Sequence, residues 1–75
     1  MRIMSKRDVN SPVPGSIDAK PLYELAGAYS DLGNAPTDGA DGSIYECTDS
    51  ENVGKIYTFS EADNAWNYTM TLKNQ

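Results

Sequence analysis

Side chains that could carry out catalysis or bind a metal are scarce in this 75-residue chain. Cys47 is the only cysteine and histidine is absent, so a thiol nucleophile would lack an imidazole base and a structural zinc site cannot form. Asp49 and Glu51 begin like a calcium loop, but Val53 and Ser60 occupy the fifth and twelfth positions, where that loop needs oxygen ligands. We therefore expect no catalytic residues, no metal site, no cofactor and no enzymatic activity.

Aromatic side chains are the second group that could have a direct function. Exposed tyrosines and Trp66 on a small β-fold could stack on sugar rings or form a protein-binding hot spot. Core packing explains the same residues more simply, because Trp66 alternates along one segment with Tyr68, Met70 and Leu72. We therefore expect these side chains in the core, with a small carbohydrate- or receptor-binding module as an alternative function.

Cys47, Trp66 and most of the tyrosines lie in three segments in which apolar and polar side chains alternate. They are Ser43–Thr48, Lys55–Ser60 and Trp66–Leu72, and each has the two-residue period of a β-strand. This pattern predicts a mainly β fold built on a three-stranded antiparallel β-meander. The expected core residues are Tyr45, Cys47, Tyr57, Phe59, Trp66, Tyr68, Met70 and Leu72.

Turn-forming residues separate the three predicted strands. Residues 49–54 are typical of a hairpin loop, in which Gly54 suits a positive φ angle or a bulge. Residues 61–65 contain Asp63 and Asn64, a pair that tolerates the left-handed region of a turn. Both connections are short enough to join antiparallel neighbours, as a meander requires.

The segment before the meander allows two interpretations. Apolar residues in 22–32 are spaced near the period of a short amphipathic helix. Alternatively, residues 22–26 form a strand that is followed by a helical turn at 30–32, which Ser30 would cap and Gly33 would end. The sequence alone does not decide between them.

The N-terminal part has the composition of an extended arm. Residues 1–21 include Pro12, Pro14 and Pro21, which disfavour helices and central strands. We therefore divide the chain into an extended N-terminal arm, residues 1–21, and a small β-meander domain, residues 22–75. The arm could bind a partner, or it could be a solvated, disordered terminus. The arm residues expected to bind a partner are Arg2, Ile3, Met4, Lys6, Arg7, Val9, Val13 and Ile17.

Size and charge indicate the kind of partner. A domain of this length buries a small share of its surface, and its single cysteine excludes an internal disulfide, so partner subunits are the expected source of further stability. The net charge of −5 comes entirely from residues 38–75, which hold seven acidic and two basic residues. Nucleic acid is therefore not expected as a partner. No apolar run is long enough for a signal peptide or a membrane span, so we expect synthesis in a cytoplasm and no membrane partner.

Four segments resemble a small module of tailed-bacteriophage virion proteins, such as head fibres, tail fibres and minor capsid components. The segments are Ala28–Leu32, Pro36–Glu46, Lys55–Phe59 and Asn64–Trp66. They match a Tyr-x-x-Leu turn, a Pro- and Gly-rich loop, a Gly-x-x-Tyr strand, a Lys-x-Tyr-x-Phe strand and a closing Trp. The resemblance implies a β-meander with a non-enzymatic structural role in the virion.

Together these observations predict a bacteriophage virion structural protein, either a capsid accessory or decoration protein or a fibre component. Its expected partners are capsid or fibre subunits, and a homo-oligomer or symmetric array is expected. The carbohydrate- or receptor-binding module is one alternative. A small acidic inhibitor protein that mimics nucleic acid is another, which the net charge of −5 supports only weakly.

Overall fold

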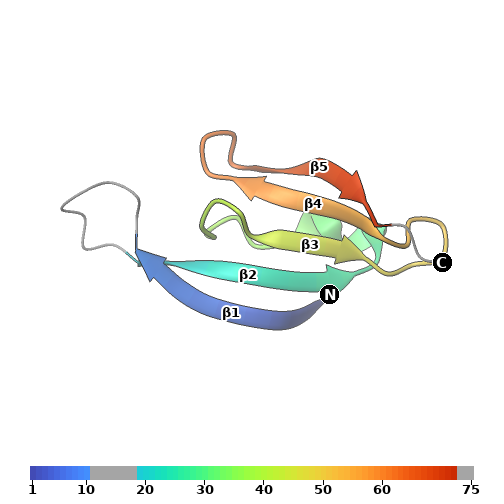
Figure 1. Cartoon of the computed structure of the whole chain (residues 1–75), viewed down its shortest axis with the longest axis horizontal. Coiled ribbons are helices and arrows are strands. Elements are labelled where there is room, and N and C mark those ends of the chain that lie inside the picture. The colour runs from blue at the N-terminus through green and yellow to red at the C-terminus, as the bar shows by residue number, and fades with distance from the viewer. Residues whose placement is uncertain (11–18, 73–75) are drawn as a thin grey trace.

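One mixed β-sheet of five strands makes up most of the molecule (Figure 1). The computed structural model describes residues 1–10 and 19–72. The strands lie side by side in sequence order, and every neighbouring pair is antiparallel except β2 and β3, which are parallel. The elements are β1 (Arg2–Asn10), β2 (Ala19–Gly27), η1 (Tyr29–Asn34, a 3-10 helix), β3 (Ile44–Cys47), β4 (Lys55–Ser60) and β5 (Ala65–Thr71).

The predicted mainly β fold is confirmed, but the predicted number of three strands is wrong. Strands β3, β4 and β5 form the expected antiparallel meander, with ends within one residue of those predicted. The two extra strands are β1, which lies wholly within the segment expected to be an extended arm, and β2, which crosses the predicted end of that arm at residue 21. Arg2–Asn10 pairs along β2, so this part of the arm belongs to the sheet, whereas residues 11–18 lie outside the described part of the chain.

Pro21 explains why β2 was difficult to predict. Proline cannot donate to a neighbouring strand and is usually excluded from central strands. Pro21 pairs with Asp8 of β1, but β3 accompanies β2 only along Glu24–Gly27, so no second strand needs its missing N–H. Its carbonyl instead accepts a hydrogen bond from the amide of Ala40 at 2.8 Å.

The segment 22–32 follows the second of the two interpretations, a strand and then a helical turn. The helix η1 is nevertheless not capped as expected, because Ala28 is its N-cap residue and no side chain caps it there. Gly33 lies inside the helix, which ends when the Ala35 amide donates to the Leu32 carbonyl at 3.0 Å.

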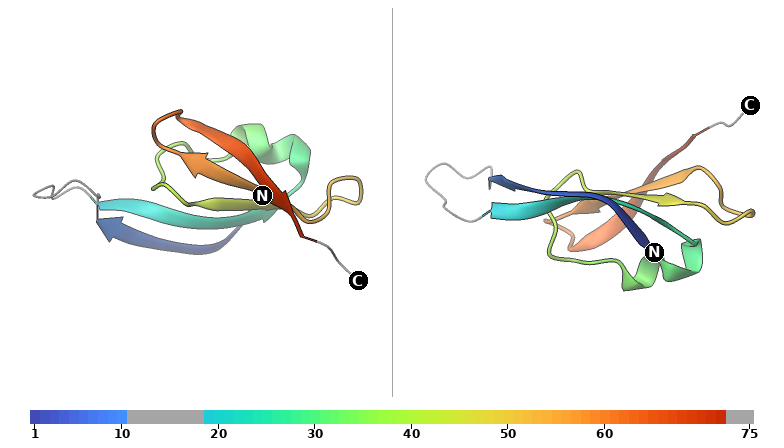
Figure 2. Two further views of the ribbon diagram at one scale, coloured as in Figure 1. Left: turned by 45° about the horizontal axis from the view of Figure 1, so that its top comes forward. Right: turned by 90° about the horizontal axis from the view of Figure 1, so that it is seen from below.

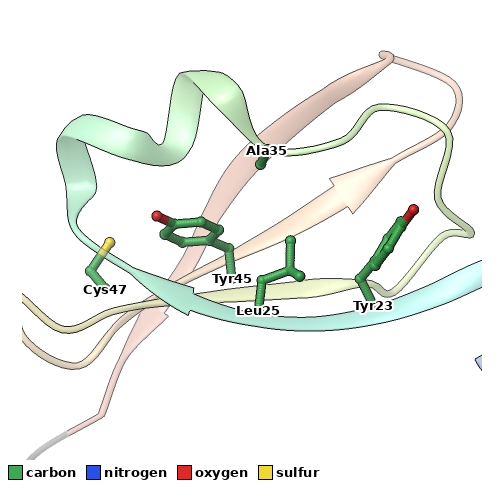
Figure 3. Packing of buried hydrophobic residues seen from close by; sticks show 5 residues of the cluster. All are labelled: Tyr23, Leu25, Ala35, Tyr45 and Cys47. Carbon is green, nitrogen blue, oxygen red and sulfur yellow. The ribbon is translucent and has the colours of Figure 1, made fainter. Parts of the chain in front are cut away.

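The core lies between one face of the sheet and the connection from β2 to β3. Two parallel strands need a crossover connection, and here η1 and the following loop lie on one side of the sheet (Figure 2). Figure 3 shows the buried cluster, in which Ala35 from the crossover faces side chains of β2 and β3. The cluster consists of Tyr23, Leu25, Ala35, Tyr45 and Cys47.

Ser43 links the crossover to the sheet from within this core. Its hydroxyl accepts a hydrogen bond from the Tyr23 amide at 3.0 Å and donates one to the Ala40 carbonyl at 2.9 Å. It is the one fully buried polar side chain among the described residues, with an exposed fraction of 0%. The sequence gives no signal for this role, because a serine beside a Gly-rich loop is equally typical of a turn.

The predicted core is correct for β3 and β4 and partly wrong for β5. Tyr45, Cys47 and Phe59 are buried, and Tyr57 and Trp66 are partly buried against the cluster. The prediction is wrong for three other residues, because their side chains are about half exposed: Tyr68 (55%), Met70 (48%) and Leu72 (45%).

Two features of β5 explain this error. The strand lies at the edge of the sheet, where Trp66 at its start contacts the crossover by donating to the Pro36 carbonyl, whereas the side chains further along β5 are left exposed. It also contains a bulge: Tyr57 pairs with Tyr68 and Ile56 pairs with Met70, so Thr69 lies opposite no residue of β4 in the strand pairing. An extra residue changes the phase of the alternation, so Met70 lies on the face opposite to Tyr68.

Carboxylates hold the loops against the sheet. Asp49 accepts hydrogen bonds from the Asn52 side chain at 2.8 Å and from the Tyr29 amide at 3.0 Å, and these bonds hold its pKa below the ordinary value. Glu61 pairs with Lys20 at 2.8 Å and accepts from the Asp41 amide, which lowers its pKa in the same way.

We expect stability to fall as the pH drops below about 4. A carboxylate with a lowered pKa binds fewer protons in the folded state, so its stabilising effect is present above its unfolded pKa and is lost on acidification. The midpoint of urea unfolding, measured from pH 7 to pH 3, should decrease across that range. The double variant Asp49→Asn/Glu61→Gln should show a shallower decrease; an unchanged pH profile would contradict the role of these two groups.

Candidate functional site

The predicted partner-binding residues gather on β1, an edge strand of the sheet. Within the described residues β1 pairs only with β2, so its other side is open. Val9 belongs to β1 by its backbone pairing with Lys20, whereas Val13 and Ile17 lie outside the described residues. Five of the predicted side chains are exposed along this edge: Arg2, Ile3, Met4, Lys6 and Arg7.

The pairing of β1 with β2 places these side chains on two faces. Arg7 lies opposite Leu22, on the face away from the crossover. Lys6 lies opposite Tyr23, on the core face, and its ammonium group is 5.7 Å from the centre of the Tyr23 ring. That distance fits a cation–π contact. Met4 is the extra residue of a bulge.

The opposite edge strand, β5, differs in chemistry. It contains no charged residue between Ala65 and Thr71, and it has no proline or glycine. Charged residues and prolines are common devices that keep an edge strand from pairing with another chain. Apart from its bulge at Thr69, β5 has none of these protective features. The sequence analysis placed this segment in the core and so did not predict that it forms an edge of the sheet.

Aromatic side chains form a row across the core face. The ring centres of Tyr29 and Tyr57 are 5.9 Å apart, and those of Tyr57 and Tyr68 are 5.7 Å apart. Further along β5, the Trp66 ring packs 5.3 Å from Phe59. Beside this row lies an open groove of about 410 Å³, lined by Tyr29, Ser30, Leu32, Gly33, Ala35, Thr37 and Trp66.

Trp66 is only partly available in this groove. Its indole N–H donates to the Pro36 carbonyl at 3.1 Å, and its ring packs edge-on against Tyr45. Tyr29, with 47% of its side chain exposed, offers the larger free aromatic surface.

No protein-family model, curated protein or solved structure matches this chain. The geometry of its own residues must therefore support any functional proposal.

The thiol of Cys47 is not accessible for chemistry at the surface. Cys47 is fully buried, and burial raises the pKa of its thiol, which keeps it protonated. The described residues contain no cluster of three or more His, Cys, Asp or Glu side chains that could hold a metal ion. No helix in the described part of the chain is long and apolar enough to cross a membrane.

Proposed function

We propose that this protein is a non-enzymatic structural protein that attaches to neighbouring protein subunits through the open edge of β1. The supporting observation is that three cationic and two apolar side chains of β1 are exposed on a strand whose outer edge pairs with no other described strand. An exposed edge binds an extended segment of a partner through backbone hydrogen bonds, while alternate side chains give specificity.

The composition of the edge favours an acidic protein surface as the partner. Arg2, Lys6 and Arg7 supply positive charge that can steer and orient the encounter. Ile3 and Met4 are more than half exposed and would lose water on binding. An attached subunit would also supply burial that a chain of 75 residues cannot obtain by itself.

The setting that we propose is the virion of a tailed bacteriophage, where the partner would be a capsid or fibre subunit. This part of the proposal rests on the resemblance of residues 28–68 to phage virion modules. The buried, protonated thiol of Cys47 is consistent with a structural role.

We expect the variant Arg2→Ser/Arg7→Ser to bind virions about thirtyfold more weakly than the original protein, since each of the two lost contacts costs on the order of 1 kcal/mol. Binding is measured by cosedimentation with phage particles assembled without this protein. Substitutions are preferable to deletion, because removing residues 2–10 would strip β1 from the sheet.

The matched control is Ser50→Glu/Val53→Glu, which changes the net charge by the same −2 at exposed positions of the β3–β4 loop. It should bind like the original protein. Equal binding by all three proteins would contradict attachment through β1.

The groove beside Tyr29 favours a second candidate function, the binding of a sugar or a receptor segment. It ranks second because Trp66, the strongest stacking residue, is already held by Pro36, Tyr45 and Phe59. A change in Trp66 fluorescence on addition of oligosaccharides would support it, and an unchanged spectrum would count against it.

A further inference from the structure

The two edge strands of the described sheet differ in charge. Strand β1 holds three basic residues and one acidic residue, which gives it a net charge of +2. The chain as a whole has a net charge of −5, so the residues outside β1 carry −7. Strand β5 is neutral, and the turn that leads into it contains two acidic residues, Glu61 and Asp63. A basic edge and an edge beside an acidic turn are therefore present on opposite sides of one molecule.

The directions of the strands allow these two edges to meet. In a sheet of five wholly antiparallel strands the first and last strands would run the same way. The single parallel step from β2 to β3 reverses this, so β5 runs opposite to β1. A second copy placed beside β5 in the same orientation would thus present its β1 antiparallel to β5, with both core faces on the same side.

We propose that β5 of one copy pairs with β1 of a second copy, which joins the two sheets into one. This inference rests on the proposed function and extends it: the neighbouring subunit at the β1 edge is another copy of the same chain, and the copy at the end of a row keeps a free β1 edge for a capsid or fibre subunit. The seven residues of β5 fit within the nine of β1. The occupant is a second copy rather than an unrelated strand because it supplies both the antiparallel direction and an exposed carboxylate, Asp63, beside the basic β1 edge.

The pairing within one copy predicts the register between copies. One row across the sheet runs from Ser5 through Glu24, Ile44 and Thr58 to Asn67. If the row continues straight into the next copy, Ser5 of that copy lies beside Asn67 of the first. The three-residue segment Ser5–Arg7 then lies opposite residues 65–67, and neither segment contains a bulge.

This register gives Lys6 and Arg7 a favourable neighbour each. Lys6 and Trp66 both lie on the core face, because they pair with Tyr23 and Phe59, so the ammonium group of one copy comes beside the indole of the next. Arg7 comes opposite Ala65, two residues from the exposed carboxylate of Asp63.

Pairing between two identical edges is less favourable. Two β1 edges would bring together two strands of charge +2, whereas two antiparallel β5 edges would pair two neutral strands and gain no attraction between unlike charges. Juxtaposed like charges oppose association. Pairing of unlike edges has no such penalty, and it leaves one free edge at each end, so copies can continue to add.

The test is the mass in solution of the purified protein and of two charge-reversed variants, measured by sedimentation velocity across a range of concentrations. The original protein should rise steadily above its monomer mass of 8.2 kDa instead of stopping at a dimer. The variant Lys6→Glu/Arg7→Glu changes the β1 edge, and Asp63→Lys/Asn67→Lys changes the β5 edge. Each variant alone should associate at least about tenfold more weakly, and an equimolar mixture should recover association because opposite charges meet again.

The matched control is Ser50→Lys/Glu51→Lys, which changes the net charge by the same +3 as the β5 variant but lies in the β3–β4 loop. It should associate like the original protein, and circular dichroism checks that every variant is folded. A monomeric original protein at all concentrations would overturn the inference, as would a dimer of the Lys6→Glu/Arg7→Glu variant alone, which would indicate pairing of two β5 edges.

Cosedimentation with virions separates this inference from the proposed function. An original protein that stays monomeric and still binds particles would overturn the pairing of copies and leave the attachment role in place. A protein that associates with itself and does not bind particles would support the pairing and overturn the virion role.

Discussion

Replacing Tyr45 with alanine should leave the protein largely unfolded at 25 °C. Tyr45 is fully buried, and its ring packs against Trp66 while its hydroxyl donates to the Ala28 carbonyl at 2.7 Å. Removing a buried aromatic side chain costs about 3–5 kcal/mol. That equals the roughly 3–5 kcal/mol that a single core of this size supplies.

Far-ultraviolet circular dichroism during a urea titration measures this effect. The conservative variant Tyr45→Phe keeps the ring and loses only the hydrogen bond to Ala28, so it should stay folded and lose about 1–2 kcal/mol. If Tyr45→Ala unfolded cooperatively within about 1 kcal/mol of the original protein, the core would not depend on this residue as we infer.

Gly54→Ala should lower the free energy of unfolding by at least about 2 kcal/mol. Gly54 has a φ angle of +87°, and a Cβ atom there would lie 2.5 Å from the Leu72 carbonyl oxygen. Its backbone joins two strands, because its N–H donates to Cys47 at 3.0 Å and its carbonyl accepts from Leu72 at 2.8 Å. Since the clash is with backbone, the end of β5 must move away from the sheet.

The midpoint of urea unfolding and hydrogen exchange at the Leu72 amide both report this change. Gly33→Ala is the control, because a Cβ atom at Gly33 has no neighbour within 4 Å and no positive φ angle is involved. It should be neutral or should stabilise by up to about 1 kcal/mol through the lower entropy of the unfolded chain. Equal losses in the two variants would refute the role assigned to Gly54.

The sequence was sufficient to predict the C-terminal meander because each of its strands has a clear two-residue alternation. Lys55–Ser60 was predicted with its exact bounds, and the turns with Gly54 and Asn64 at positive φ angles were predicted as well. These features are local: they depend on the order of apolar residues and on residues that tolerate particular backbone angles.

The N-terminal strands could not be predicted in this way. In β1 the bulge at Met4 interrupts the alternation of apolar and polar residues, and the basic residues make the segment too polar to be recognised as a strand. In β2 the proline at position 21 argues against a strand unless its neighbours are known. Both segments become strands because they pair with other parts of the chain, and a single sequence does not show which segments pair.

The candidate site was predicted in part for a related reason. The residues that we propose bind a partner were chosen from their types in the N-terminal segment, but the placement of five of them on a sheet edge follows from the topology. The open edge at β5 was missed, because an alternating segment such as Trp66–Leu72 reads the same in the centre and at the edge of a sheet. Only the absence of charge along β5 marked it as an edge able to pair.

The parallel junction between β2 and β3 also has a mechanical consequence. It joins the N-terminal hairpin to the C-terminal meander through only four residue pairs, Glu24–Gly27 with Ile44–Cys47. If copies joined into a row, tension along the row would load these four pairs in every copy, together with the crossover that connects the same two strands. These four pairs and the hydrogen bonds of Ser43 to Tyr23 and Ala40 would then contribute to the force at which such a row breaks.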